Sequence, residues 1–460
     1  MSGKLYILAV LACALCSGQT DAVPPSDENR NPGANQTSER WNLFFQATSI
    51  GQYHGTFRAL YQGPNSLQDQ SEAHVSLTTT LFFGYRLTRN THFYFDPEIA
   101  GGKGFSDVTG IANFTNGEIP RVATATPKPY LARLYITHDF GFGSQKETFE
   151  SDETQLAGDR PMTRYSITAG RFTATDFFDN NRYSHEPRTQ FIGWAVMYNG
   201  AWDYPADVHG YTSGWVHEFH TRHYSLRYGS VAEPKVANGL RFDHRIFRNR
   251  GDLFEGEARY SLVGHPGAVR LLGFLHHTNS GTYADAIRLS EQTGGKPDVT
   301  ATRRNGNLKY GSGLSADQEI TRDVGVFGRL GWNDGKTESF AFTAIDRLAS
   351  GGVSVTGSRW GRRFDTVGSA YTVSGLAAVH AQYLARGGLD FLIGDGALRY
   401  GTERIWESYY NTRLFPGFFA SIDVQRIVNP AFNRDRGPLW AGSLRLHVEF
   451  GKDAIARFRP

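Results

Sequence analysis

Cysteine is almost absent from this chain of 460 residues, which contains only two. Both of them, Cys13 and Cys16, lie in an apolar run that begins at Leu5 and follows the positive charge of Lys4. This pattern, with small residues after it, predicts a secretory signal peptide over residues 1–22. The mature chain would then hold no cysteine. That excludes a small secreted domain built on disulfides and is typical of a bacterial envelope protein.

Long apolar runs are missing beyond the N-terminal segment. A membrane-spanning helix needs about 20 consecutive apolar residues, and the mean hydropathy of this chain is only −0.42. A β-barrel escapes this test, because only every second residue of its strands must be apolar. Charge of one sign is also scarce. The net charge is +3, and without a concentrated basic run or zinc-finger spacing we expect no nucleic-acid partner.

Short alternating runs fill the chain from Trp41 onward, separated by Gly, Pro, Asn and Asp. In LRLHVEF, residues 444–450, apolar residues alternate with Arg445, His447 and Glu449. In a soluble sheet the apolar face would pack on a core, whereas in an outer-membrane barrel it would face lipid. With the signal peptide and the missing cysteines, we predict that the apolar residues face lipid and the polar ones the lumen.

Similar runs predict an all-β protein, a transmembrane antiparallel β-barrel of about 16 strands, possibly 18. No long stretch has helical periodicity, although a short helix around 376–386 is compatible with the pattern. The strand candidates are 75–87, 130–140, 164–172, 224–231, 253–262, 268–275, 323–332, 339–346, 417–428 and 444–450.

Connections between the candidate strands are uneven in length. Residues 332–336 and 248–252 are predicted to form tight turns, whereas 98–129 and 173–208 are long and rich in Gly, Asn and Asp. Short turns at one end and long loops at the other are the arrangement of outer-membrane barrels.

Several longer motifs occur in a fixed order. They are FYFDPEIAGGKGFSDVTGIANFTNGE (93–118), YLARLYI (130–136), AGRFTATDFFDNNRYSHEPRTQF (169–191), NGAWDYPAD (199–207), GDGALRYGTERIWESYYN (394–411) and IVNPAFNRDRGPLWAGSLRLHVEF (427–450). Together they resemble the carbohydrate-selective outer-membrane porin family, the OprB-like porins, over nearly the whole mature chain. The resemblance implies a sixteen-stranded barrel that admits small carbohydrates by diffusion and needs no cofactor. It also implies a location in the outer membrane, with lipid, lipopolysaccharide and the barrel-assembly machinery as partners.

The domain plan follows from these features. We expect a signal peptide at 1–22, a flexible periplasmic leader at 23–40, the barrel at 41–450 and an extension at 451–460. Outer-membrane barrels commonly end on an aromatic residue that the assembly machinery reads. Phe450 would fill this role here, so either the signal is tolerated internally or the extension folds back into the periplasmic mouth.

The densest mixture of arginines, carboxylates and aromatic rings is RFTATDFFDNNRYSHEPRTQ, residues 171–190. Arg offers a planar fork of donors to sugar hydroxyls, carboxylates accept from them, and rings cover apolar sugar faces. Our hypothesis is that this loop folds inward and narrows the pore; the alternative is a solvated extracellular loop held by local salt bridges. The candidate residues of the constriction and sugar site are Asp96, Glu98, Arg133, Arg171, Asp176, Asp179, Arg182, His185, Arg188 and Arg227.

Other readings stay open at this point. Any one of these candidate residues could instead form a structural ion pair in the barrel wall and make no contact with sugar. The motif HEFHTRH at 217–223 lacks the spacing of a helical zinc site, and no Gly-x-Ser-x-Gly elbow occurs, so we expect neither metal nor catalysis. The alternatives to a sugar pore are a general non-selective porin, an outer-membrane barrel enzyme or adhesin, and a secreted soluble β-protein.

Overall fold

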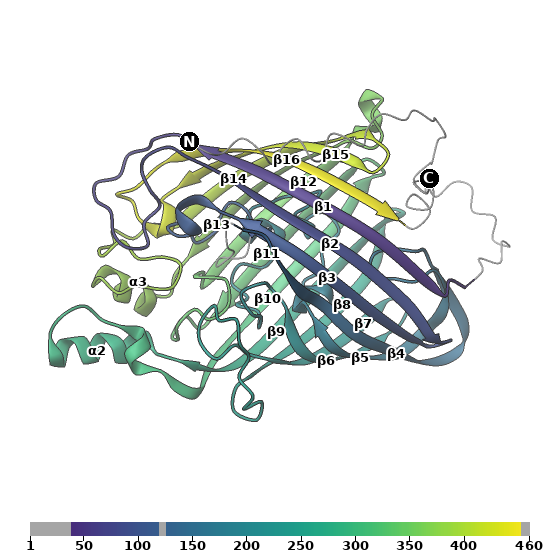
Figure 1. Ribbon diagram of the computed structural model, residues 1–460, viewed down its shortest axis with the longest axis horizontal. Helices are drawn as coiled ribbons and strands as arrows, with labels where there is room; N and C mark the ends of the chain where they lie inside the picture. The colour runs from purple at the N-terminus through teal and green to yellow at the C-terminus, as the bar shows by residue number, and fades with distance from the viewer. Residues whose placement is uncertain (1–37, 119–125, 452–460) are drawn as a thin grey trace. The chain divides into compact units, whose positions relative to one another are not determined.

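Sixteen antiparallel strands close into one barrel in the computed structural model, which describes residues 38–118 and 126–451. Each strand pairs with its neighbours in the chain, and β16 closes the sheet against β1 (Figure 1). The fold class and the lower of the two expected strand counts are confirmed. In the part of the chain described, no helix is long and apolar enough to cross a membrane.

The strands form the wall of the barrel, and three short α-helices lie in the connections between them in the part of the chain described. The helices are α1 Trp194–Met197, α2 Tyr283–Thr293 and α3 Ala378–Ala385. The strands are β1 Trp41–His54, β2 Glu72–Thr88, β3 Thr91–Gly102, β4 Lys128–Phe149, β5 Gly158–Phe172, β6 Thr212–His220, β7 Tyr224–Ala232, β8 Arg250–Leu262, β9 His265–Ser280, β10 Arg304–Thr321, β11 Val324–Asn333, β12 Arg347–Thr356, β13 Thr366–Gly375, β14 Glu403–Phe415, β15 Phe418–Val428 and β16 Leu439–Gly451.

Strand β16 shows how the alternation of the sequence becomes two faces of the wall. Leu444 and Leu446 are about half exposed on the outside, at 53% and 51%, whereas Arg445 and His447 are 1% exposed on the inside. The predicted division into an apolar outer face and a polar inner face is confirmed for these four residues. Phe450 is less exposed because its ring packs against another aromatic ring at the end of β15.

The alternation expected for β4 fails at one point, beside the candidate Arg133. Asp96 pairs with Arg133, but the next residue of β3, Pro97, pairs with Leu131, so Ala132 is an extra residue in β4. A bulge of this kind re-aims the side chains on either side of it. Leu131 therefore does not continue the row of Arg133, as strict alternation along the strand would require.

The connections at the two ends of the barrel differ in length as expected. Those at one end are short, from the two residues between β8 and β9 to the nine between β12 and β13. At the other end the connection between β5 and β6 runs over residues 173–211. By the usual orientation of such barrels, the short turns are periplasmic and the long loops extracellular.

Three local predictions were wrong, and all fall in extracellular connections. Residues 332–336 and 248–252 are not tight turns: the first opens the β11–β12 connection, and the second lies where the β7–β8 connection enters β8. Residues 339–346 are not a strand but the buried part of the β11–β12 connection, where both Phe340 and Ala341 are buried. Burial on both sides removes the two-faced environment that an alternating strand needs.

Helix α3 confirms the short helix expected around 376–386, whereas α2 was missed. Thr282 caps the N-terminus of helix α2, and its hydroxyl accepts a hydrogen bond from the backbone of Asp285. Its buried side chains are Tyr283, Ala286 and Ile287, a stripe of little more than one turn. So short an apolar stripe does not stand out from the alternating pattern around it.

A buried charge cluster joins three extracellular connections. His380 of α3 lies between two carboxylates, with Nδ1 2.9 Å from Asp346 and Nε2 3.3 Å from Asp390. The ring of Tyr283 in α2 stacks on the imidazole at 4.2 Å, and its hydroxyl donates to Asp390. The cluster therefore ties α2 and α3 to the β11–β12 connection.

We expect this cluster to make the extracellular loops sensitive to alkaline pH. Burial alone would lower the pKa of His380, but the two carboxylates raise it to about 9. A pKa raised by folding means that the protonated imidazole contributes stability that is fully present below about pH 6.5 and is lost as pH rises through the folded value. We expect hydrogen exchange in α2 and α3 to speed up between neutral pH and about pH 10, after correction for the intrinsic rate. The variant His380→Gln should exchange fast already at neutral pH; equal protection of both proteins at both pH values would contradict this role.

Candidate functional site: a constriction inside the barrel

The long connection between β5 and β6, residues 173–211, folds into the lumen. We call it the constriction loop. Glu407 on β14 accepts hydrogen bonds from the backbone of Ile192 and Gly193 at 2.7 and 3.0 Å. Arg445 on β16 donates to the backbone carbonyl of Pro187 at 2.6 Å. Because β14 and β16 are far from β5 in the strand order, the loop must reach across the lumen. The inward fold of this loop is confirmed.

A cavity of about 370 Å³ lies between the constriction loop and the wall formed by β2, β3 and β4. Its charged lining includes Glu98 on β3 and Arg133 on β4, together with Asp176 and Arg188 from the loop. Residues of the β3–β4 and β4–β5 connections complete the lining, among them Glu118. The constriction loop and the wall thus enclose a cavity in the interior of the barrel.

Arg188 holds the loop against the wall through all three guanidinium nitrogens. Nε donates to Glu118 at 2.7 Å, Nη2 donates to Glu98 at 3.1 Å, and Nη1 donates to Gln46 on β1 at 2.7 Å. Tyr211 also donates its hydroxyl to Glu98, at 3.1 Å. The guanidinium is 13% exposed, so it remains part of the cavity surface while its position is fixed.

Arg133 forms a second ion pair in the same cavity. It donates to both carboxylate oxygens of Asp176, at 2.8 and 2.7 Å, and lies 3.6 Å from Asp96. A bidentate pair fixes the orientation of both groups. Asp176 belongs to the constriction loop, so this pair also fixes the distance between loop and wall.

Aromatic rings form the other side of the cavity. The indole of Trp194 stacks on Phe114 with centroids 4.9 Å apart and contacts Tyr198 at 5.5 Å. Phe342, from the buried β11–β12 connection, packs against both Trp194 and Tyr204. Sequence reasoning missed this wall. The one feature of the sequence that pointed to it was the number of aromatic residues in and near 191–204. Phe114 and Phe342 could not be linked to it, because they come from other connections.

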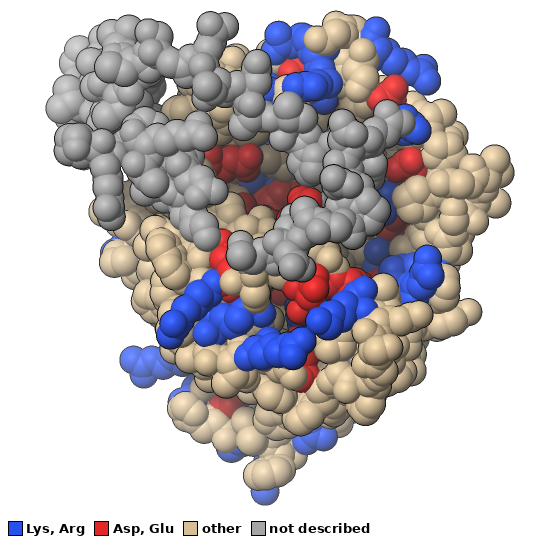
Figure 2. Space-filling view, turned by 90° about the vertical axis from the view of Figure 1, so that its right-hand side faces the viewer, with Lys and Arg blue, Asp and Glu red and all other residues tan. Residues whose placement is uncertain are grey.

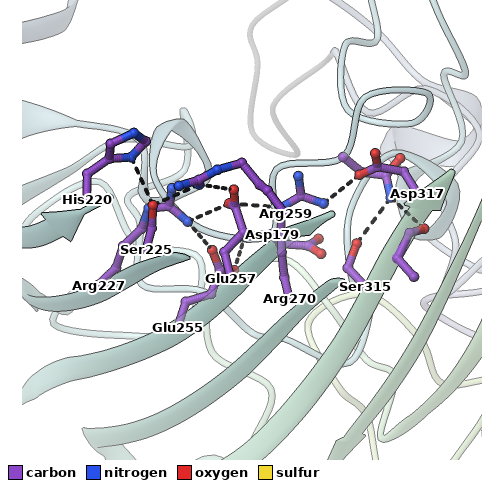
Figure 3. Close-up of polar contacts among 12 residues, drawn as sticks. Asp179, His220, Ser225, Arg227, Glu255, Glu257, Arg259, Arg270, Ser315 and Asp317 are labelled. Carbon is purple, nitrogen blue, oxygen red and sulfur yellow. Dashed lines mark hydrogen bonds and ion pairs between the residues drawn. The ribbon is translucent and has the colours of Figure 1, made fainter. Parts of the chain in front are cut away.

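A second cavity, of about 430 Å³, adjoins the first and shares Asp176 and Asn180 with it. Its lining includes guanidinium and carboxylate groups on β5 to β9. In Figure 3, Arg227 points toward Glu255 and Glu257, at 2.8 and 2.9 Å. Arg270 bridges Glu257 to Asp317 on β10. Figure 2 views the end with the short turns, where Lys and Arg lie along part of the rim and Asp and Glu line the hollow.

The ten candidate residues divide into three groups. Glu98, Arg133, Asp176, His185 and Arg188 line the first cavity, and Arg227 lines the second. Asp96, Arg171 and Asp179 are held in ion pairs with Arg133, Asp207 and Arg329 and line neither cavity. Arg182 lies 3.5 Å from Glu319 on β10, away from both cavities. Glu118 and the aromatic wall were not foreseen. Among the residues described, no His, Cys, Asp and Glu cluster has the geometry to hold a metal ion.

Two carboxyls of the connections give the constriction a pH-dependent charge. Burial raises the pKa of Glu118 to about 7, partly offset by Arg188, and burial raises the pKa of Glu153 to about 8. Both groups are therefore charged at alkaline pH and neutral at acidic pH.

We expect cation selectivity to fall as pH falls from about 9 to about 6, because the cavity loses negative charge. Reversal potentials in a salt gradient measure this. Glu118→Gln should flatten the response near pH 7, whereas Glu291→Gln, on the exposed surface of α2, should not. Identical profiles for all three proteins would show that Glu118 does not face the ion path.

Comparisons with known proteins found one family model and several solved barrel structures. The family model described as "Carbohydrate-selective porin, OprB family" matches residues 66–450. The structure of Pseudomonas putida OprB matches at a TM-score of 0.66 and 15% identity, covering 90% of this chain and 94% of that one. Acinetobacter baumannii OccAB1 and Pseudomonas aeruginosa OccK2 match at TM-scores of 0.46 and 0.44, each with 9% identity; the matches cover 91% and 90% of this chain and 99% and 98% of theirs. No curated protein matches.

The matched residues, 66–450, include β2 to β15, the constriction loop, and all of β16 except its last residue. A closed antiparallel barrel with an apolar outer face and a polar interior is the architecture of outer-membrane porins. This chain belongs to the OprB family of carbohydrate-selective porins.

Proposed function

We propose that sugars cross the outer membrane through the first cavity, and that the cavity selects them by size and hydrogen bonding. The observation that carries the proposal is the pairing of two fixed guanidinium groups, Arg133 and Arg188, with an aromatic wall around Trp194 in one cavity of about 370 Å³. No energy source or cofactor enters this account.

The two sides of the cavity suit the two kinds of sugar surface. Sugar hydroxyls can exchange hydrogen bonds with Glu118 and with guanidinium edges, and so replace part of their hydration. The C–H faces of a sugar ring can lie against Trp194 and Tyr198. Because each Arg is already paired with carboxylates, a neutral sugar meets no unpaired guanidinium group at these two positions. Affinity should be weak, since a tight site would hold the solute too long to conduct.

The remaining expectations about export and partners are part of the same proposal. Residues 1–22, most of the leader and residues 452–460 lie outside the described part of the chain, so signal cleavage and the role of the extension stay predictions. We expect outer-membrane lipid and lipopolysaccharide to surround the barrel and the assembly machinery to insert it. The family and the fold imply a channel rather than an enzyme.

Swelling of liposomes that contain the purified barrel tests the function. Monosaccharides should enter fast and trisaccharides slowly, and sugars should enter faster than amino acids of similar size. A general porin would sort solutes by size alone. Equal rates for sugars and size-matched amino acids would therefore overturn the proposed selectivity, and no swelling with any solute would overturn the pore.

A further inference from the structure

The connection between β7 and β8, residues 233–249, exposes apolar and cationic side chains side by side. Phe247 is 91% exposed and Ile246 is 40% exposed. Arg245 and Arg248 flank this pair, and Arg241 is exposed earlier in the same connection. Neighbouring exposed apolar and cationic side chains combine the two interactions, apolar burial and attraction to anionic lipid, by which surface segments bind membranes.

The segment lies on the extracellular rim of the wall. The guanidinium of Arg250, at the start of β8, reaches the backbone carbonyl of Ile246 at 3.5 Å. Asn249 bonds to the start of β10, donating to Asn305 at 3.1 Å and accepting from the backbone of Gly306 at 3.0 Å. The segment therefore spans the ends of β8 and β10.

The rim position faces lipid on its outer side. Arg250 and Phe254 lie four residues apart on β8, so their side chains share a face. Phe254 is 45% exposed. Glu255, the next residue along β8, lies on the opposite face, where it is 3% exposed and points into the lumen. Because Arg250 is on the lipid-facing side and contacts Ile246, the segment stands next to the outer leaflet rather than over the pore.

The charges of the segment are mostly unbalanced. Asp243 binds Arg245 through both oxygens, at 2.8 and 2.6 Å, and also accepts from Asn249. This pair neutralises Arg245 and stiffens the turn. Within the described ranges, no carboxylate forms an ion pair with Arg241 or Arg248. The segment thus offers two free guanidinium groups beside two exposed apolar side chains.

We propose that residues 241–248 bind the phosphorylated, acylated glycolipid of the outer leaflet, lipopolysaccharide. Arg241 and Arg248 contact its phosphates, and Ile246 and Phe247 enter its acyl layer. Both chemistries are needed to fill this surface: a free phosphate leaves the apolar pair in water, and a neutral lipid leaves the cations without counterions. The inference rests on the outer-membrane placement of the proposed function but not on its sugar selectivity.

Binding of fluorescent lipopolysaccharide to the detergent-solubilised full chain tests the proposal. The double variant Arg241→Gln/Arg248→Gln should bind at least about ten-fold more weakly than the parent protein. Phe247→Ser should also weaken binding. The side chain that it replaces is so exposed that we expect no effect on folding. The matched control is Arg359→Gln/Arg363→Gln in the β12–β13 turn, which removes two exposed arginines from the opposite end of the barrel and should bind as the parent does.

Further binding measurements distinguish between the possible ligands of this surface. Millimolar inorganic phosphate should not release the lipid, and dephosphorylated lipopolysaccharide should bind the parent and the double variant equally weakly. Release by phosphate alone would overturn the glycolipid in favour of a small-anion site. Unchanged binding by all variants would overturn the proposal. It would also be overturned if the parent were oligomeric in the absence of lipid and the variants monomeric, because the surface would then bind a second copy of the chain. Sugar entry into liposomes should be the same for these variants as for the parent, because the substitutions lie at the rim. A failure of the proposed sugar pore is therefore detected independently of lipopolysaccharide binding.

Discussion

Leu446→Arg should prevent the chain from assembling as an outer-membrane barrel, whereas Leu446→Phe should assemble normally. Leu446 lies in the closing strand, 51% exposed on the outer face, and pairs with Ser49 of β1 and Ala420 of β15. An arginine on the lipid face costs about 2–4 kcal/mol near the middle of the membrane. None of these neighbours offers a carboxylate to pair with it. The yield of heat-modifiable protein in the outer-membrane fraction measures the effect.

The inward face of the same strand supplies the control. Glu449→Gln removes a charge two residues before the strand ends, and we expect it to leave assembly unchanged because the group faces water rather than lipid. If Leu446→Arg were to assemble as well as Glu449→Gln, the outer face of β16 would not contact lipid, and the orientation of the whole strand would be wrong.

Arg188→Ala should widen the constriction and weaken the block of the channel by sugar. The side chain joins the constriction loop to Glu98 and Gln46 on the wall and to Glu118 of the β3–β4 connection. Without it, two carboxylates lose their counterion, take up water and repel each other. We expect a larger single-channel conductance and a half-blocking sugar concentration raised by about ten-fold, the loss of roughly one charged hydrogen bond.

Two further variants separate contact with sugar from loss of structure. Arg188→Lys keeps the charge but not the planar fork of donors. Its conductance should therefore stay close to that of the parent, whereas its block by sugar should be weaker. Arg182→Ala changes an arginine of the same loop that lines neither cavity and should behave as the parent. If Arg188→Ala and Arg182→Ala gave the same conductance and the same block as the parent, Arg188 would not form the constriction.

The barrel was predictable because lipid and lumen impose opposite requirements on successive residues. Leu444 and Arg445 show this directly, and the same rule identified most of the wall. The extracellular connections were less predictable. Residues 339–346 alternate like a strand, yet they pack into the interior of the long-loop end, where burial on all sides leaves no face to distinguish.

The site was predictable in composition and less so in geometry. The richness of 171–190 in charge and rings located the constriction loop, and it brought Asp176, His185 and Arg188 to the cavity. The same composition also included Asp179, which is buried against Arg329. Sequence cannot say which loop side chains turn toward the wall, because that depends on contacts such as those of Glu407 and Arg445 from strands more than 200 residues away.

Single-channel current through the purified barrel, titrated with a panel of mono- and disaccharides, tests the central claim most directly. We predict open channels whose current falls saturably with one class of sugar, and a weaker fall in Arg188→Ala. Open channels that no sugar blocks, in the parent and the variant alike, would contradict a sugar-binding constriction.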